Sequence, residues 1–397
     1  MKIKVAENPG KLEISKSAVV YGLCITAQLS RASAWIKTEN ILDTFMTLLQ
    51  LFCVAYYGVL KIRKKKLSYL DLAAAGFYFC LLISTVLVSR DYVSWFTYAI
   101  QGLGTIFLVE ELFEDDQIMG VLLIRNISFG FLVVNLLTII AFPQGIGSTY
   151  YYFLGSRIGF TPFVLIAVGA AVLADVIAEE RRISIFSAAV FGIALLNLFL
   201  QRVSTGIIAL VLIAAFLTVR FLVGEAMDYL ANYWVLTGIW IAVFLIAVFT
   251  DKEMLQTILS WFHEDTTFGG RTIIWQTACS YIAEKPVTGY GVTPTGAFYI
   301  SAYIKDRMLP AHNEILNILY QGGALALTGF ASMLFAVGRM ISQCADKYLA
   351  GLAAVLIFVI CCVMITEIQT QKAIFFMLAA MAYQTAANNT SDTIEQS

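Results

Sequence analysis

The sequence predicts an all-α, polytopic integral membrane protein. Hydrophobic residues make up 59% of the 397 residues and charged residues only 13%, and the mean hydropathy is +0.79. A soluble domain needs roughly 25% charged residues to cover its surface. Apolar stretches of about 18 to 25 residues recur along the chain, which is the length that an α-helix needs to cross roughly 30 Å of hydrocarbon. The short alternating segments of a membrane β-barrel are absent from the sequence.

Polar residues divide these apolar stretches into about twelve predicted transmembrane helices. They lie near residues 17–35, 41–60, 68–88, 92–112, 117–141, 159–178, 183–200, 205–223, 232–250, 323–341, 348–366 and 373–387. We expect residues 1–387 to form a single transmembrane domain, which includes one long loop at about 251–322. The polar tail 388–397 is predicted to be disordered.

Basic residues predict the orientation, because cytoplasmic connections retain Lys and Arg. The block at 61–66, Lys-Ile-Arg-Lys-Lys-Lys, places its connection in the cytoplasm. Alternation then puts the loop at 251–322 outside and both termini inside. The same alternation groups further basic residues on the cytoplasmic side, namely Arg181, Arg182, Arg220, Arg339, Lys347 and the N-terminal lysines. Arg31 and the long polar lead favour an uncleaved first helix over a signal peptide.

Charge and cysteine content exclude several classes of function. A formal net charge of -1 argues against a strong nucleic-acid-binding field. The seven cysteines lack a CxxC pair and favour neither a disulfide framework nor a zinc site, so we interpret them as small buried hydrophobes. Two distant histidines without spaced carboxylates also predict no protein-bound metal.

The long loop is expected to contain two short helices. Apolar residues at helical spacing predict one helix over 271–284, ended by Pro286. The same spacing predicts a second helix over 311–320, which Gly322 and Gly323 separate from the next span. Both histidines of the chain, His263 and His312, also lie in this loop.

Two loop residues are candidates for chemistry. Arg271 follows two glycines and opens a helix, so its guanidinium and unpaired backbone N–H groups are suited to a phosphate; a solvated loop arginine is the alternative. His312 begins an amphipathic helix near the predicted membrane surface, where an imidazole titrates near neutral pH and can transfer protons. A helix-capping or hydrogen-bonded histidine is the alternative there. We interpret His263, among Trp261 and acidic neighbours, as a surface residue.

Three further arginines occupy unusual places. Arg202 lies in a short outward turn, where basic residues are scarce, and either serves the site or reaches lipid phosphates. Arg157 is a weaker case of the same kind. Arg125 falls inside an apolar run, where a charge is costly and usually has a partner, so we expect a pair with Glu110 or Glu111; a functional pathway is the alternative.

The order of motifs in the loop resembles the superfamily of O-antigen ligases and Wzy-type polymerases. These motifs are Gly-Arg-x-x-Ile-Trp (270–275), Lys-Pro-x-x-Gly-Tyr-Gly (285–291) and Ala-His-Asn-x-x-Leu (311–316), followed by Gly-Gly. Together they cover about 50 residues, and the predicted twelve spans agree with the polytopic architecture of this superfamily. Members are membrane glycosyltransferases with a large extracytoplasmic loop.

The resemblance implies residue roles. Arg271 matches an arginine that binds the donor pyrophosphate, and His312 matches a histidine that acts on the acceptor hydroxyl. A second outward arginine is expected in a Ser-Arg-Gly-like turn, but this chain has threonine there, in Ser204-Thr205-Gly206. Arg202 stands three residues earlier, and we expect it to reach the same site from one helical turn away. The loop is then predicted to fold over that turn, with Arg202, Arg271 and His312 lining one outward cavity.

The implied function is metal-independent transfer of a glycan from undecaprenyl pyrophosphate to the hydroxyl of an acceptor glycan or glycolipid, as a polymerase or a ligase. The implied location is the bacterial cytoplasmic membrane, with the active site outside. The resemblance implies no cofactor, and it implies other polysaccharide-assembly membrane proteins as further partners. A transporter or flippase of polysaccharide or lipid-linked oligosaccharide is the alternative; it predicts polar residues along a midplane cavity. A third possibility is a structural relative without activity, because Thr205 stands where the superfamily pattern has an arginine.

Overall fold

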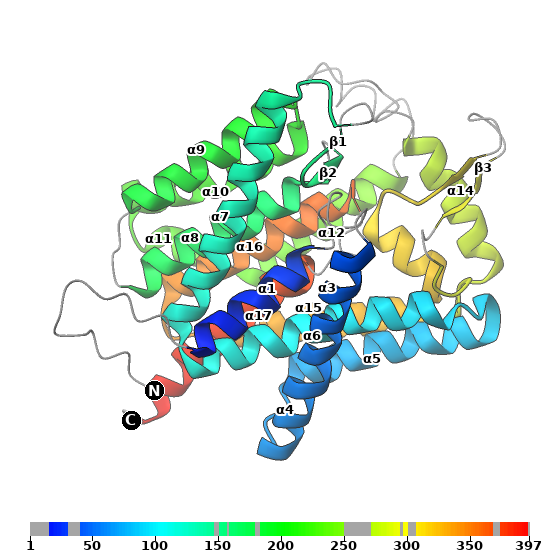
Figure 1. The fold of residues 1–397 in the computed structure, drawn as a ribbon, viewed down its shortest axis with the longest axis horizontal. Helices are drawn as coiled ribbons and strands as arrows, with labels where there is room; N and C mark the ends of the chain where they lie inside the picture. Colours follow the sequence, from blue (N-terminus) through cyan, green and yellow to red (C-terminus); the bar gives the residue numbers. More distant parts are fainter. Residues whose placement is uncertain are drawn as a thin grey trace.

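The computed structural model is a bundle of long helices with two small hairpins (Figure 1). It describes residues 16–30, 40–146, 151–156, 159–178, 183–249, 271–293, 297–300, 307–367 and 374–395. Over these residues the secondary structure is almost entirely helical, which confirms the predicted all-α class.

The N-terminal helices follow the predicted spans closely. Two of them contain a π-helical segment, which lies inside the helix in one case and at its C-terminal end in the other. In chain order the helices are α1 Lys16–Ser30, α3 Asn40–Phe52 with η1 Cys53–Tyr57 and α4 Gly58–Lys64, α5 Tyr69–Ser84 with η2 Thr85–Ser89, α6 Tyr92–Asp115, and α7 Gln117–Ala141. A two-residue hairpin, β1 Tyr151–Tyr152 and β2 Gly155–Ser156, follows α7.

The remaining helices build the other half of the bundle and the described part of the loop. They are α8 Thr161–Ile177, α9 Ile185–Leu200, α10 Ser204–Val223, the short α11 Ala226–Leu230, α12 Tyr233–Phe249, α14 Arg271–Glu284, α15 Glu314–Gln343, α16 Lys347–Met364 and α17 Ile374–Glu395. Strands β3 Phe298–Ile300 and β4 Arg307–Leu309 pair antiparallel between α14 and α15.

Each of the twelve predicted spans coincides with a helix. Seven described helices are long and apolar enough to cross a membrane, and four shorter apolar helices, α1, α8, α9 and α12, add to them. The chain is therefore a multi-pass membrane protein. The number of crossings stays a prediction, as does the outward position of the loop.

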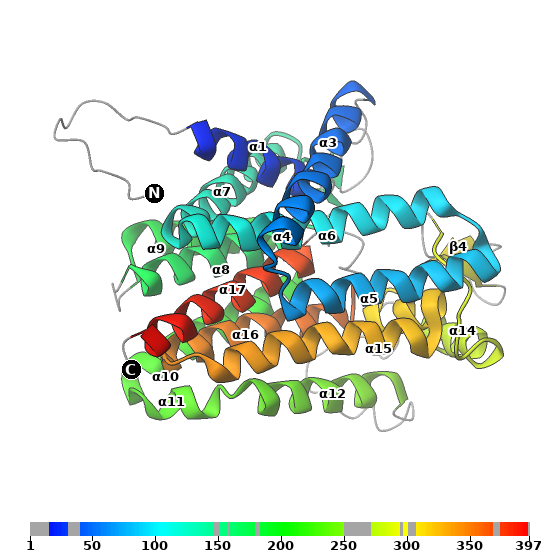
Figure 2. The same ribbon diagram turned by 90° about the horizontal axis from the view of Figure 1, so that it is seen from below.

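The centre of the bundle is formed by α8, α16 and α17. Nearly every residue of α8 is buried, which is expected of a helix that is apolar on all sides. Gly169 in α8 allows close packing, since a Cβ there would come 3.3 Å from Leu356 of α16 and 3.4 Å from Leu378 of α17. Figures 1 and 2 show these helices surrounded by the others.

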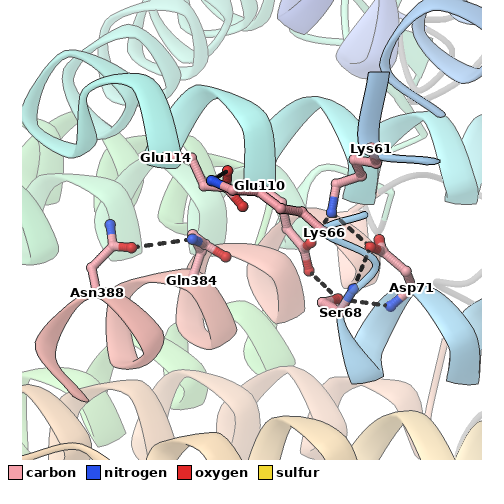
Figure 3. Close-up of polar contacts among 8 residues, drawn as sticks. All are labelled: Lys61, Lys66, Ser68, Asp71, Glu110, Glu114, Gln384 and Asn388. Carbon is pink, nitrogen blue, oxygen red and sulfur yellow. Dashed lines mark hydrogen bonds and ion pairs between the residues drawn. The ribbon is translucent and has the colours of Figure 1, made fainter. Parts of the chain in front are cut away.

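One end of the bundle gathers the basic residues that the sequence places together. Lys61 donates to Asp71 Oδ2 at 2.6 Å and also contacts Glu110, and all three side chains are about 1% exposed (Figure 3). Ser68 caps α5 and donates to Glu110. Arg339 stacks on Tyr69 and Arg220 on Tyr348 at this same end. We call it the lysine end; Arg181 and Arg182 lie outside the described residues.

The predicted pairing of Arg125 is wrong. Glu110 and Glu111 are taken by Lys61 and Lys64, which reach them from the neighbouring connection. The Arg125 guanidinium instead lies over the ring of Phe186 in α9, 4.1 Å from its centroid. A cation over an aromatic face is stabilised without a directly paired carboxylate.

Part of the C-terminal tail is described as the end of a helix, while the predicted disorder of 388–397 as a whole stays a prediction. Helix α17 continues through residues 388–395. Asn388 donates to Phe113 O at 3.1 Å, and Thr390 donates to Gln343 O at 3.1 Å. These polar residues satisfy carbonyl groups where helices end, so they extend the helix although they lack apolar periodicity.

Candidate functional site

The three loop motifs share one small hydrophobic core. Its buried members come from α14, β3 and the start of α15, and they are Ile274, Trp275, Ala278, Phe298, Ala311, Leu316 and Tyr320. Ile274 and Trp275 belong to the first motif, and Ala311 and Leu316 to the third. Tyr290 of the second motif packs against the edge. Motifs about 40 residues apart therefore form one unit, which we call the loop core.

Aromatic rings fix the second motif to the loop core. Tyr290 stacks on Tyr320 with ring centroids 5.0 Å apart, and Tyr281 meets both rings edge-on. The Tyr290 hydroxyl donates to Glu284 Oε2 at 2.6 Å. Burial, and then this carboxylate, raise the pKa of Tyr290 above its usual value. The phenol therefore stays protonated near neutral pH and acts as a structural donor.

The second motif docks on the break in α15, which confirms the predicted separation of the short helix from the next span. The helix is interrupted at Gly323, where φ is 58° and ψ is -158°. Four backbone hydrogen bonds join the turn at 285–291 to this break: Tyr290 N to Tyr320 O, 2.7 Å; Gly291 N to Gln321 O, 2.7 Å; Ala324 N to Pro286 O, 2.8 Å; and Leu325 N to Val287 O, 3.3 Å.

Glycine is required at the contact. A Cβ at Gly323 would come 2.3 Å from the backbone of Val287, and one at Gly289 would come 2.6 Å from Tyr320 O. Both glycines also have positive φ, of 58° and 62°. Gly289 and Gly323 therefore serve backbone packing, and the chemistry must come from other motif residues.

Arg271 is the first residue of α14, so it stands at the positive end of that helix. Its Nη2 donates to Glu367 Oε1 at 3.0 Å, and the two side chains are 24% and 15% exposed. Glu367 closely follows α16. Glu367 is not among the predicted site residues, because a single acidic residue after a span carries no sequence signal and its partner is 96 residues away.

His312 has a left-handed backbone, with φ of 47°, and a half-buried side chain. The residues before and after His312 in the chain are both fixed by tertiary contacts. Ala311 is fully buried in the loop core. Asn313 caps α15 by accepting from Leu316 N at 3.1 Å, and its Nδ2 donates to Ile365 O at 3.0 Å. Non-glycine residues in this conformation are uncommon and cluster at functional sites.

The segment after α16 contacts both Arg271 and the residue that follows His312. Arg271 pairs with Glu367, and Asn313, the residue after His312, is anchored two residues earlier on Ile365. The loop core joins their helices on the other side. The described contacts thus place the Arg271 guanidinium and the N-terminus of α14 at Glu367, and the residue next to His312 at Ile365.

Arg202 occupies the turn between α9 and α10. Val203 N donates to Leu198 O at 3.0 Å and Arg202 N to Phe199 O at 3.1 Å, which is the Schellman pattern of a helix C-terminus. Its φ is 53°, and its side chain is exposed. Arg202 therefore precedes α10 rather than lying one helical turn before Thr205, as the sequence argument assumed.

The turn lies at the same end of the bundle as Arg271. Helices α8 and α16 run antiparallel and meet at Gly169 and Leu356. Thr161 lies eight residues before Gly169, about 12 Å along the helix, and so is level with the last turn of α16. A Cβ on Gly206 of α10 would come 3.0 Å from Thr161 Oγ1. A cavity shared by Arg202, Arg271 and His312 stays a prediction.

Arg157 and the residues 250–270, which include His263, lie outside the described residues. The hairpin before Arg157 is fixed to α7 and α9, because Leu154 N donates to Asn135 Oδ1 at 2.9 Å and Asn135 Nδ2 donates to Asn197 Oδ1 at 2.9 Å. It also lies at the end that carries Arg202.

Comparison with family models identifies the motif-bearing part of the chain. Residues 189–331 match the model of the O-Antigen ligase family. This segment, about a third of the chain, is similar to O-antigen ligases. It includes Arg202, Arg271 and His312 and ends before Glu367. The resemblance to the O-antigen ligase and Wzy-type superfamily is therefore confirmed. No curated protein and no solved structure matches the chain. Members of this family are membrane enzymes of polysaccharide assembly, and the match indicates that class of enzyme for this chain.

Proposed function

We propose that the protein is a metal-independent glycosyltransferase of surface polysaccharide assembly. It transfers a glycan from undecaprenyl pyrophosphate to the hydroxyl of an acceptor glycan or glycolipid, on the outer side of the bacterial cytoplasmic membrane. The observation that carries this proposal is that Arg271 and Asn313, the residue after His312, are both anchored on residues 365–367, and that both lie in the segment that matches the O-Antigen ligase family.

The reaction is a single displacement. The acceptor oxygen attacks the anomeric carbon of the donor sugar, and the bond from that carbon to the pyrophosphate oxygen breaks. The electron pair leaves with undecaprenyl pyrophosphate, while the hydroxyl proton passes to the His312 imidazole. The configuration at the sugar carbon is inverted.

Arg271 stabilises the charge that grows on the leaving pyrophosphate. Its position at the start of α14 adds backbone N–H groups and the helix dipole to the guanidinium. Preorganised donors of this kind lower the barrier by about 3 to 4 kcal/mol each. Glu367 holds the guanidinium in place, and the exposed Arg202 supplies a second cation from the α9–α10 turn.

The transporter alternative receives less support. It predicts charged groups along a midplane cavity. Of the described buried charges, Lys61, Asp71, Glu110 and Glu111 are instead paired at the lysine end. Asp175 accepts from Ser184 N just before α9, and Glu314 is the first residue of α15. Arg125, the intramembrane charge that most favoured a pathway, lies over Phe186.

The test uses purified protein in lipid nanodiscs with a lipid-linked repeat unit as donor and acceptor. Replacing His312 with alanine is expected to lower kcat about 10² to 10⁴-fold, as for loss of a general base. Arg271→Ala is expected to lower it about 10² to 10³-fold. Gln276→Ala, on the exposed face of the same α14, is the matched control. A well-folded His312→Ala protein with native turnover would remove His312 from the mechanism. A ladder of products indicates a polymerase and a single transfer a ligase.

A further inference from the structure

An apolar groove runs between α12 and α15, on the lipid-facing side of the bundle. Its volume is about 380 Å³, and its lining includes Trp234, Trp240 and Phe244 of α12 and Phe330 and Phe335 of α15. Figure 2 shows the two helices side by side. The lining on α12 extends from Tyr233 to Leu245, about 18 Å at 1.5 Å per residue.

The groove is closed at the end that lies nearer the lysine end of the bundle. The Tyr233 hydroxyl donates to Leu334 O at 2.7 Å, and Tyr233 packs so closely on Gly338 that a Cβ there would come 2.1 Å from its ring. The helices therefore touch near the lysine end, and the groove separates them further along. Trp234 and Phe335 remain 42% and 59% exposed, so the groove is open to the lipid.

The other end reaches the candidate site. Ile315 lines the groove and lies three residues after His312 in the chain. Asn313 fixes this start of α15 to Ile365, beside the Arg271–Glu367 pair. An apolar chain in the groove would thus emerge where a pyrophosphate meets Arg271.

We propose that the groove between α12 and α15 holds the polyprenyl chain of the glycan donor. The proposal rests on the proposed function for the nature of the donor. Lipid tails are as apolar as the groove, so transfer into it yields little hydrophobic energy. The groove acts through van der Waals packing of the methyl-branched chain on aromatic side chains, and it directs the pyrophosphate toward Arg271.

The decisive variant fills the groove without disturbing the core. Ala331 is a small, exposed residue of the lining, so Ala331→Trp occupies the space of the chain. Ser332→Trp is the control, because Ser332 is also exposed, at the next position of α15, but lies off the groove. Donors with an undecaprenyl and with a farnesyl chain are compared. We expect Ala331→Trp to lower kcat/KM about tenfold for the undecaprenyl donor and to spare the farnesyl donor, while Ser332→Trp changes neither.

A second measurement does not depend on turnover. A polyprenyl phosphate with a photoreactive tail is crosslinked to the native protein and to both variants, and the labelled peptides are mapped. Labelling of α12 and α15 that Ala331→Trp abolishes and Ser332→Trp retains supports the groove. Labelling spread over other lipid-facing helices such as α9, equal competition by phospholipid, or equal loss of both donors in Ala331→Trp overturns it. If no donor is turned over but the labelling stays in the groove, the proposed function fails and the polyprenyl site stands.

Discussion

Gly323→Ala tests the contact that holds the second motif against α15. The added Cβ would lie 2.3 Å from the carbonyl carbon and oxygen of Val287 and 2.7 Å from Thr288 N, all of them backbone atoms. The backbone angles of Gly323, φ 58° and ψ -158°, fall in a region that only glycine adopts without strain. Neither the side chain nor the neighbour can rotate away, so the turn must move.

The free-energy cost of Gly323→Ala is set by whichever of two outcomes requires less energy. Keeping the turn in place requires about 1 to 3 kcal/mol of backbone strain, and the overlap with Val287 adds to it. Releasing the turn loses four backbone hydrogen bonds, each contributing about 1 kcal/mol. We therefore expect Gly323→Ala to destabilise the loop core by about 3 to 4 kcal/mol. Donor turnover falls with it, because Arg271 and His312 lie at the edge of that core.

The assay compares thermal unfolding in detergent and donor turnover for Gly323→Ala and a matched variant. Gly130→Ala in α7 is the control, since nothing lies within 4 Å of its Cβ position. There the change should stabilise the helix by about 0.5 to 1 kcal/mol. If Gly323→Ala melts and turns over donor like Gly130→Ala, the docking of the second motif does not maintain the site.

Three further changes probe other parts of the structure. Lys61→Met leaves two buried carboxylates without their cation, so it should cost about 3 to 5 kcal/mol in the free energy of unfolding; an unchanged melting temperature would show that this cluster is dispensable. Arg202→Gly should keep or slightly raise stability, because glycine suits φ of 53°, while lowering donor turnover as much as Arg202→Ala does; native turnover would assign Arg202 to a structural cap. Burial raises the pKa of the Cys279 thiol, so it should react slowly with an impermeant maleimide at neutral pH, whereas Ser280→Cys, at the exposed neighbouring position, should label in intact cells. Labelling only after permeabilisation would place the loop inside.

Local sequence signals predicted most of the helices well. Helix α14 spans Arg271–Glu284, as predicted from apolar spacing and Pro286, and the break at Gly323 falls where two glycines interrupt the pattern. Such features depend on residues within one or two helical turns of each other. Their physical cause, apolar periodicity and the backbone preferences of glycine and proline, can be read directly from the sequence.

Contacts between distant residues were not predictable in this way. Glu367 pairs with Arg271 across 96 residues, and Arg125 finds the ring of Phe186 instead of a carboxylate. Both outcomes depend on which helices become neighbours, and many acidic or aromatic residues fit equally well before the fold is known. The strands β3 and β4 have three residues each, too few for an alternating pattern to show.

The motif residues separate into two groups with different physical tasks. Gly289, Gly323, Trp275 and Tyr290 build a packed unit whose contacts permit little substitution. His312 and Arg202 instead carry left-handed backbones, a conformation that costs a non-glycine residue about 1 to 2 kcal/mol. Stability alone would favour glycine at both positions. Lys65 and Arg90 share this backbone and, like Arg202, closely follow a helix, where a left-handed residue is an ordinary way to end it. His312 instead precedes a helix, so the strained backbone points to a special constraint at His312 more than at Arg202.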